Sequence, residues 1–188
     1  MVRSIVTISV LFAAAALMMP AAASSCYRGS HDDGELTFRG EAEGNRFQGR
    51  FREFQVAMCP DDDDSTRARI EVEIRMASAT VGNRQGDREL LGSDLFFTDQ
   101  FPVARWISQP FEFSSAGEQL VEGELNLRGI KASQPVRLDF ADVDGQQRLS
   151  GGAEIERLVF DVGQGEFADP EFISPLIELA FELILAAD

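Results

Sequence analysis

The sequence SATVGNRQGDRELLGSDLFFTDQFP, residues 78–102, interrupts a chain that otherwise has the pattern of β-strands. Just before it, residues 69–76 alternate charged and apolar side chains, which predicts a strand with one face in an apolar interior and the other in water. Within the interruption, Leu90, Leu91 and Leu95 recur at nearly helical spacing, so we expect a short helical insertion at residues 87–97. Such an element either closes one end of a β-structure or fills a hole in its core, and the two roles are compatible.

The alternation continues on both sides of this stretch. Period-two patterns occur at residues 121–127, 136–140 and 177–185, and a further strand begins at Leu36. Within residues 47–58 the pattern changes phase, which predicts a β-bulge near residues 52–53. About eight strands with short links predict an all-β fold, a single extended antiparallel eight-stranded barrel with the helical insertion. A β-sandwich is the alternative, because periodicity alone does not separate the two.

A barrel of eight strands either fills its interior with side chains or holds one small ligand. The inward positions are aliphatic and aromatic, and Gly123 and Gly151 are expected to leave room between them. An apolar lining selects an apolar ligand, since each buried polar group would need a hydrogen-bond partner. The residues that we expect to line the cavity are Phe38, Phe51, Ile70, Val72, Ile74, Trp106, Leu125, Leu127, Leu138, Phe140, Ile155 and Phe181.

Several short pieces, in this order and spacing, resemble the YceI-like family. They are FQGRF at residues 47–51, the block at 78–102, GELNLRGI at 123–130, and AEIER at 153–157 leading into GQGEFAD at 163–169. The resemblance covers about residues 36–186 and implies a lipocalin-like barrel that holds a polyisoprenoid chain or similar long lipid, for carriage or storage. The chain departs from the family pattern at Gly86, at Glu89 and at residues 95–97, so no polar head-group site is transferred from relatives.

Arg157 is the charged residue that the strand pattern points into the interior. It keeps the parity of Leu149, Gly151 and Ile155, and an inward arginine must be paired or lie near the mouth. It is therefore either a contact for the polar head group of a ligand or part of a structural salt bridge. The acid proposed for such a bridge is Asp87, which is also the second candidate for a head-group contact.

The first 23 residues have the pattern of a cleaved signal peptide, with Arg3, an apolar run and a small-residue site ending at Ala23. Residues 24–188 are then one domain, exported to the periplasm or secreted, with no stable membrane span. In an oxidising compartment, Cys26 and Cys59 are most simply one disulfide. The alternative, a lipid anchor on Cys26, lacks the expected upstream leucine and would leave Cys59 unpaired.

Charge and composition exclude several functions. The chain has 32 acidic and 17 basic residues and a net charge of −15, which opposes binding to nucleic acids and to anionic lipid surfaces. His31 is the only histidine, so no catalytic triad or metal cluster is expected, and the acids at 61–64 predict a solvated turn rather than a calcium site. We therefore expect no enzyme activity and no cofactor apart from a bound lipid.

Two hypotheses follow from different protein classes. The first is an exported binding protein for a long-chain isoprenoid or fatty lipid, and the second is a filled barrel that acts as a structural or protein-interaction module. A continuous apolar cavity favours the first, whereas an interior closed by side chains favours the second. An enzyme acting on isoprenoids would need a buried polar group, for which only Arg157 and Asp87 are candidates. A homodimer is compatible with either hypothesis.

Overall fold

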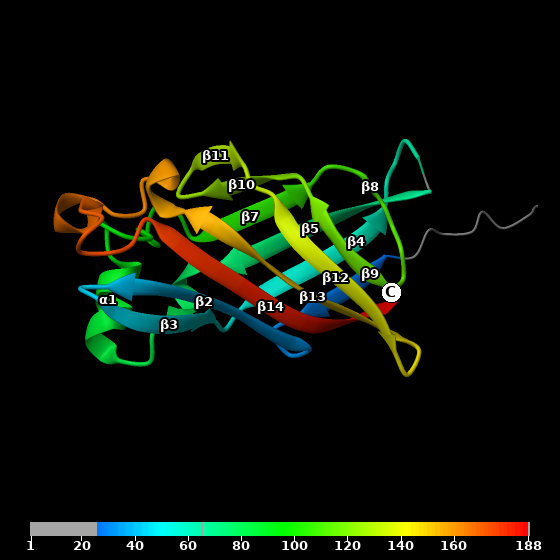
Figure 1. The fold of residues 1–188 in the computed structure, drawn as a ribbon, viewed down its shortest axis with the longest axis horizontal. Coiled ribbons are helices and arrows are strands. Elements are labelled where there is room, and N and C mark those ends of the chain that lie inside the picture. The colour runs from blue at the N-terminus through cyan, green and yellow to red at the C-terminus, as the bar shows by residue number, and fades with distance from the viewer. Residues whose placement is uncertain (1–25, 65, 188) are drawn as a thin grey trace, which may run out of the picture.

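Antiparallel β-strands make up most of the chain (Figure 1). The computed structural model describes residues 26–64 and 66–187, so the predicted signal peptide lies outside the described residues. The strands are β1 (Tyr27–Ser30), β2 (Gly34–Ala42), β3 (Asn45–Phe51), β4 (Phe54–Pro60), β5 (Arg67–Arg75), β6 (Ala79–Thr80), β7 (Val103–Ser108), β8 (Phe111–Glu112), β9 (Gly117–Val121), β10 (Gly123–Leu127), β11 (Ile130–Ser133), β12 (Val136–Val143), β13 (Gln146–Glu156) and β14 (Leu176–Ala187). The helices are α1 (Arg84–Leu91) and the short 3-10 turns η1 (Met76–Ser78), η2 (Arg157–Phe160) and η3 (Gly165–Ala168).

The strands form two halves that are joined through the short strand β1. Along the main path the order is β11-β10-β7-β5-β4-β1-β14-β13-β12-β9, and β2 and β3 extend from β14. β1 pairs with β4 on one side and with β14 on the other. The path ends at β11 and β9 without closing, so the predicted closed barrel of eight strands is wrong, although the all-β antiparallel fold is confirmed.

The open topology arises where predicted strands break. The alternation at residues 121–127 predicts one strand, but β9 pairs with β12 and β10 pairs with β7, so the chain passes between the two halves at Glu122. The predicted bulge at residues 52–53 is likewise a break between β3 and β4. There the hydroxyl of Ser78 accepts hydrogen bonds from the backbone N–H groups of Arg52 and Glu53, at 3.2 and 3.1 Å. The change of phase in the sequence marks this corner.

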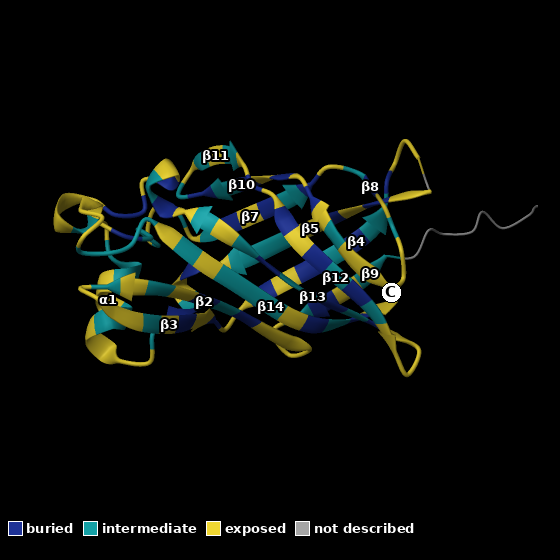
Figure 2. Cartoon of the chain, viewed as in Figure 1, coloured by how far each residue is buried: buried dark blue, intermediate teal, exposed yellow. Residues whose placement is uncertain are grey.

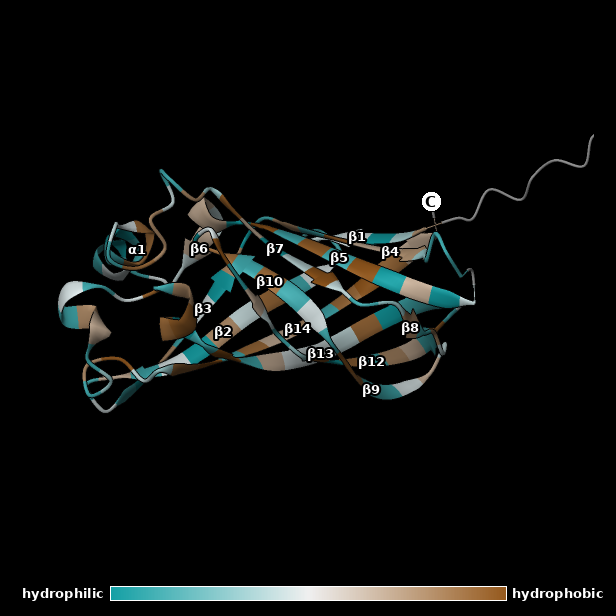
Figure 3. Cartoon of the chain, turned by 90° about the horizontal axis from the view of Figure 1, so that it is seen from above, coloured by the Kyte–Doolittle hydropathy of each residue, from teal (hydrophilic) through white to brown (hydrophobic). Residues whose placement is uncertain are grey.

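The inward faces of both halves make one apolar core (Figures 2 and 3). At the end away from α1, Phe140 stacks with Phe111 and meets Phe113 edge to face, so this end is filled. Gly123 does not leave space for a ligand, because the indole of Trp106 lies where its Cβ would be, 2.5 Å away. The ring of Phe181 similarly occupies the space over Gly151.

Cys26 and Cys59 form a disulfide, as the sequence predicted. The bond fastens the chain just before β1 to β4, next to the joint between the halves. Within the described ranges, no helix has the length and apolarity needed to span a bilayer.

Candidate functional site

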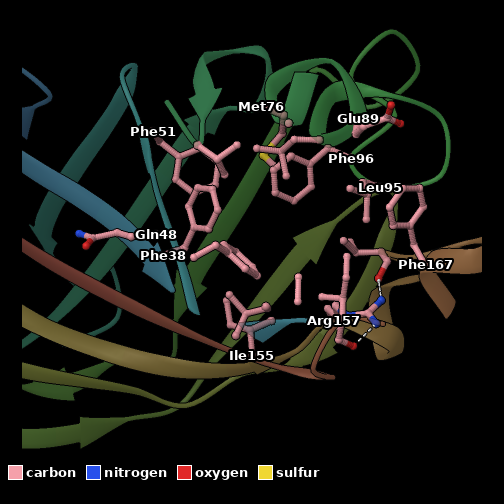
Figure 4. Close-up of a pocket in the computed structure, with 18 of the residues that line it drawn as sticks. Phe38, Gln48, Phe51, Met76, Glu89, Leu95, Phe96, Ile155, Arg157 and Phe167 are labelled. Atoms are coloured by element: carbon pink, nitrogen blue, oxygen red, sulfur yellow. Dashed lines mark hydrogen bonds between the residues drawn. The ribbon is translucent and has the colours of Figure 1, made fainter. Parts of the chain in front are cut away.

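A cavity of about 630 Å³ lies at the end of the sheets that carries α1 (Figure 4). This volume is typical of sites for small organic ligands. Strand residues form its floor and walls, and residues from α1, the loop after it and the segment 162–173 form its cover. The apolar lining includes Phe38, Phe51, Ile74, Leu125, Leu127, Ile155, Ile177 and Leu179 from the strands, and Leu90, Leu95, Phe96, Phe167, Phe172 and Ile173 from the cover.

A second, narrower pocket of about 80 Å³ continues deeper between the two halves. Ile74, Leu125, Ile155 and Leu179 line both spaces, so these four residues, which we name the neck, mark the boundary between them. The deep pocket is lined by apolar side chains with the exception of Gln134. A wide chamber that narrows into a dry channel accepts a long apolar chain better than a compact polar molecule.

The structure brings most of the predicted lining residues together. Phe38, Phe51 and Leu127 line the wide chamber, and Ile70, Val72, Trp106, Leu138 and Phe181 line the deep pocket; Ile74, Leu125 and Ile155 belong to both. Phe140 lines neither, because it is buried further along in the filled end. Whether these side chains contact a ligand stays a prediction.

Arg157 is buried, but not in the way that the strand pattern indicated. β13 ends at Glu156, and Arg157 begins η2 with only 3 % of its surface exposed. Its guanidinium donates to the backbone carbonyl oxygens of Ser174, Val162 and Ile173, at 3.0, 2.8 and 2.6 Å. Burial lowers the pKa of this group, although arginine stays charged in proteins.

The predicted salt bridge between Arg157 and Asp87 is wrong. The carboxylate of Asp87 accepts hydrogen bonds from the hydroxyl of Thr80, at 2.9 Å, and from the N–H of Val81, at 2.7 Å. Asp87 does not line the cavity; it fastens α1 to β6 instead. Within the described part of the chain no carboxylate lies within salt-bridge distance of Arg157, so its charge is balanced only by carbonyl dipoles.

The cover is held in place by backbone hydrogen bonds. The N–H groups of Gly163 and Gln164 both donate to the carbonyl of Asp94, at 2.9 and 2.8 Å, which joins the loop after α1 to the segment after η2. On the far side of that segment, the N–H of Glu43 donates to the carbonyl of Phe172 and the N–H of Ser174 to that of Glu41. The cover is therefore hydrogen-bonded to the β2–β3 hairpin.

The mouth of the chamber lies between β3 and α1. Residues 45–49 of β3 pair with β2 on one side, and β6 pairs only with Arg50 and Phe51 on the other. The rim beside this unpaired edge is polar, in contrast to the interior. It consists of Arg46 and Gln48 from β3 and of Asn83, Gln85 and Glu89 on or beside α1.

Sequence patterns missed two parts of the site. Phe167, Phe172 and Ile173 lie in irregular or 3-10 segments, where no period-two or helical pattern exists to reveal them. Gln134 is the other omission: its carbonyl accepts from the indole N–H of Trp106, at 2.9 Å, and its side-chain amide donates to the carbonyl of Glu154, at 3.1 Å. It thus closes the gap between β7 and β13, and nothing in the sequence marks it.

The site offers groups for binding but no recognisable set for catalysis. Among the described residues, no three His, Cys, Asp or Glu side chains gather as a metal site would require. The acids at 61–64 belong to a turn far from the cavity, where Asp61 binds Arg69 at 2.9 Å and Asp64 binds Thr66. Glu89 is the acid among the residues that line the chamber.

Comparison with known proteins gives a consistent match. The family model described as a YceI-like domain matches residues 27–185. A UPF0312 protein of Shewanella denitrificans is 29 % identical over 124 residues, which are 66 % of this chain and 62 % of that protein. The UPF0312 protein plu2095 of Photorhabdus laumondii is 29 % identical over 92 residues, which are 48 % of this chain and 46 % of that protein. The chain thus spans less than two thirds of these relatives' lengths.

Solved structures share the fold. BcnA of Burkholderia cenocepacia superposes with a TM-score of 0.73 at 21 % identity, covering 81 % of this chain and 96 % of BcnA. A polyisoprenoid binding domain from Saccharophagus degradans, implicated in plant cell wall breakdown, gives a TM-score of 0.68 at 15 % identity. That match covers 88 % of this chain and 99 % of the domain. At these identities the likeness concerns the fold.

Proposed function

Because this chain belongs to the YceI-like family, we propose that it is an exported binding protein that holds a polyisoprenoid or similar long-chain lipid in its cavity, for carriage or storage. The observation that carries the proposal is that the wide chamber and the narrow, apolar pocket adjoin each other and share the lining residues Ile74, Leu125, Ile155 and Leu179. The name of the Saccharophagus degradans neighbour, a polyisoprenoid binding domain, supports the same ligand class.

The orientation of the ligand follows from the polarity of the two spaces. The deep pocket is apolar and suits the tail, whereas the chamber has a polar rim and borders Arg157. The charge of Arg157 has no carboxylate partner in the described ranges, which supports a polar head group near the cover. Export is supported by the Cys26–Cys59 disulfide, since such bonds persist in oxidising compartments.

The primary test is organic extraction and mass spectrometry of the protein purified from its native exported compartment. A long-chain isoprenoid at about one molecule per chain is the expected result. Trp106 lines the deep pocket, so its fluorescence should also change when polyprenols are added to emptied protein. An empty protein with unchanged Trp106 fluorescence would favour the filled barrel that acts as an interaction module, because the end around Phe140 is already packed.

A variant at the neck tests the path of the tail. Ile155→Phe adds bulk where the chamber meets the deep pocket, so the variant should lose long polyprenols while it keeps short ones that end in the chamber. Native mass spectrometry with polyprenols of graded length measures the change. Leu120→Phe, on a side chain that is 69 % exposed on β9, is the control. An unchanged length limit in Ile155→Phe would show that the tail does not pass the neck.

A further inference from the structure

The arginines of this acidic protein fall into two groups. Arg3 lies outside the described residues, which leaves 16 basic residues. Of these, 11 have a partner. The partner is a carboxylate in an ion pair, a carbonyl oxygen in a hydrogen bond or, for Arg28, another contact. In the part of the chain that the structure describes, five side chains have none. These five, which we name the arginine face, are Arg46, Arg50, Arg52, Arg84 and Arg88, and all are exposed.

The arginine face occupies one side of the mouth. Arg46 and Arg50 are on the outward side of β3, and Arg52 follows in the corner before β4. Arg50 lies directly opposite Thr80 of β6, so their side chains share the outer side of the sheet. Thr80 binds Asp87 of α1, which brings the helix to that side, and Arg84 and Arg88 are one helical turn apart on it. Figure 1 shows α1 beside β3, and Figure 3 shows α1 at the end of the molecule that carries β6.

Folding alone does not favour these positions. Arg84 is the first residue of α1, where the helix dipole disfavours a positive charge. Arg84 and Arg88 also repel each other at a spacing of four residues. The acids nearby do not neutralise them: Asp87 is held by Thr80, Glu53 is paired with Arg75, and Glu89 forms no ion pair with either helix arginine. An external anionic surface would supply the counter-charge that Arg84 and Arg88 lack within the protein.

We propose that the arginine face docks the protein on an anionic phospholipid bilayer, with the mouth turned toward the lipid. Four of the five arginines do not line the cavity, so they are unsuited to the head group of the cargo and suited to a surface outside it. Charges beyond about 8 Å are screened at physiological ionic strength, so the overall negative charge does not prevent local attraction. The acids at 61–64 are at the other end of the molecule in Figure 1. The exposed acids Asp161, Glu166, Asp169 and Glu171 lie in the segment that contains η3 and its flanking turns, whereas the five arginines lie on or beside β3 and α1, so we take β3 and α1 as the approach side.

The purpose of docking rests on the proposed function, but its test needs no cargo. Purified full-length mature protein is sedimented with vesicles of phosphatidylcholine alone or with 30 mol% phosphatidylglycerol, on the order of the anionic content of natural membranes. One variant replaces Arg50, Arg52, Arg84 and Arg88 by Gln. The matched control replaces four exposed and paired cations by Gln, namely Arg69, Arg105, Lys131 and Arg137. Both variants have the same net charge, so a difference between their affinities for the vesicles depends on where the replaced cations lie on the surface.

We expect the unmodified protein to bind the phosphatidylglycerol vesicles, with an affinity that falls as salt is added. The affinity should fall more than about tenfold in the first variant and stay unchanged in the control. Equal binding to neutral vesicles, no binding to either, or equal loss in both variants would overturn the proposal. So would full release by millimolar inorganic phosphate at constant ionic strength, because that would indicate a site for a single phosphate group. Extraction of lipid from the same variants is measured separately, so failure to dock is distinguished from failure to hold a cargo.

Discussion

At the scale of single residues, Gly163 determines whether Arg157 can stay buried. Gly163 has a φ of +119°, and a Cβ there would lie 1.9 Å from Nη1 of Arg157. Gly163→Ala should therefore displace the guanidinium from its three carbonyl partners. We expect a loss of roughly 2–3 kcal/mol in the free energy of unfolding beyond the backbone cost, because hydrogen bonds to a buried charge are lost. Urea denaturation measures it.

The control for this substitution is Gly145→Ala. Gly145 also has a positive φ, of +81°, but no atom lies within 4 Å of the place that a Cβ would take. Both variants place an alanine at a positive φ, and only Gly163→Ala meets neighbouring atoms: Nη1 of Arg157 at 1.9 Å and the carbonyl oxygen of Phe167 at 2.6 Å. Equal destabilisation of both would mean that the packing of Gly163 against the guanidinium contributes nothing.

Asp61 gives the protein a specific response to acid. The hydrogen bonds from Arg69, followed by that from the N–H of Asp63, hold the pKa of this carboxylate below its ordinary value. A depressed pKa in the folded state stabilises the fold at pH values above about 3.9, and this contribution is lost as the pH falls through the folded pKa. Asp61→Asn should flatten the decline of Tm between about pH 5 and pH 2. Asp62→Asn, at an exposed neighbour, is the control, and an identical pH profile in both would refute the role of Asp61.

The residues of the cavity were predictable where a strand continues and not where it ends. Alternation correctly assigned Ile74, Trp106 and Leu125 to the interior, because the two faces of a strand differ throughout its length. The same rule placed Arg157 inward, and Arg157 does line the chamber, but the rule did not give its partners, since β13 ends one residue earlier. Its partners are backbone carbonyls from a distant segment, which side-chain identity does not encode.

At the scale of elements, α1 depends on a few polar contacts. None of its residues is fully buried: Leu90 and Leu91 pack partly against the core at its end, and the cap by Asn83 and the bonds from Thr80 and Val81 to Asp87 hold its start. Asp87→Ala should speed amide hydrogen exchange in α1 by about 5- to 30-fold, with the central strands unchanged, because a lost cap or network costs about 1–2 kcal/mol locally. Hydrogen exchange followed by mass spectrometry measures both regions.

The same variant separates two roles for Asp87. If the residue acted only as a head-group contact, its loss would weaken ligand binding without changing exchange in α1. Glu89→Gln, on the rim of the cavity, is the comparison: it should leave exchange in α1 unchanged. Fast exchange in both variants would mean that α1 is loose regardless of Asp87.

Elements that pass between the halves were the hardest to predict. The leucine spacing predicted a helical insertion at residues 87–97. The helix exists, but it begins at Arg84, directly after the cap by Asn83, and it ends at Leu91. Residues 121–127 kept one unbroken pattern although they form two strands. Val121 at the end of β9 is buried, as are Gly123, Leu125 and Leu127 of β10, so the break at Glu122 leaves no trace in the alternation.

At the scale of the whole molecule, the fold class was predictable and the closure was not. Period-two patterns establish antiparallel strands around an apolar core. Whether the sheet closes depends on which edges meet, and these contacts join residues far apart in the chain. Here the halves are hydrogen-bonded through β1, whereas on the opposite side Gln134 contacts Trp106 and Glu154 without a strand ladder.

This arrangement predicts what the disulfide does. β1 is four residues long, yet it is the strand that joins β4 to β14 along the path of the sheet. Cys26 precedes it and is bonded to Cys59 of β4, 33 positions away in sequence. Replacing both cysteines by serine should lower the free energy of unfolding by about 3–4 kcal/mol on the chain-entropy model. Denaturation in urea, with and without reductant for the unmodified protein, measures it.

The position of the bond makes the expected effect regional as well as global. Without it, β1 is held only by its backbone pairs with β4 and β14, so hydrogen exchange should rise first in Tyr27–Ser30 and in the adjoining ends of those two strands. α1 and the mouth lie at the other end of the sheets and should exchange as before (Figure 1). If exchange rose uniformly, the disulfide would act only on the unfolded chain. If it rose first around α1, the two halves would be held together mainly at the mouth, and β1 would not be the joint that the strand order indicates.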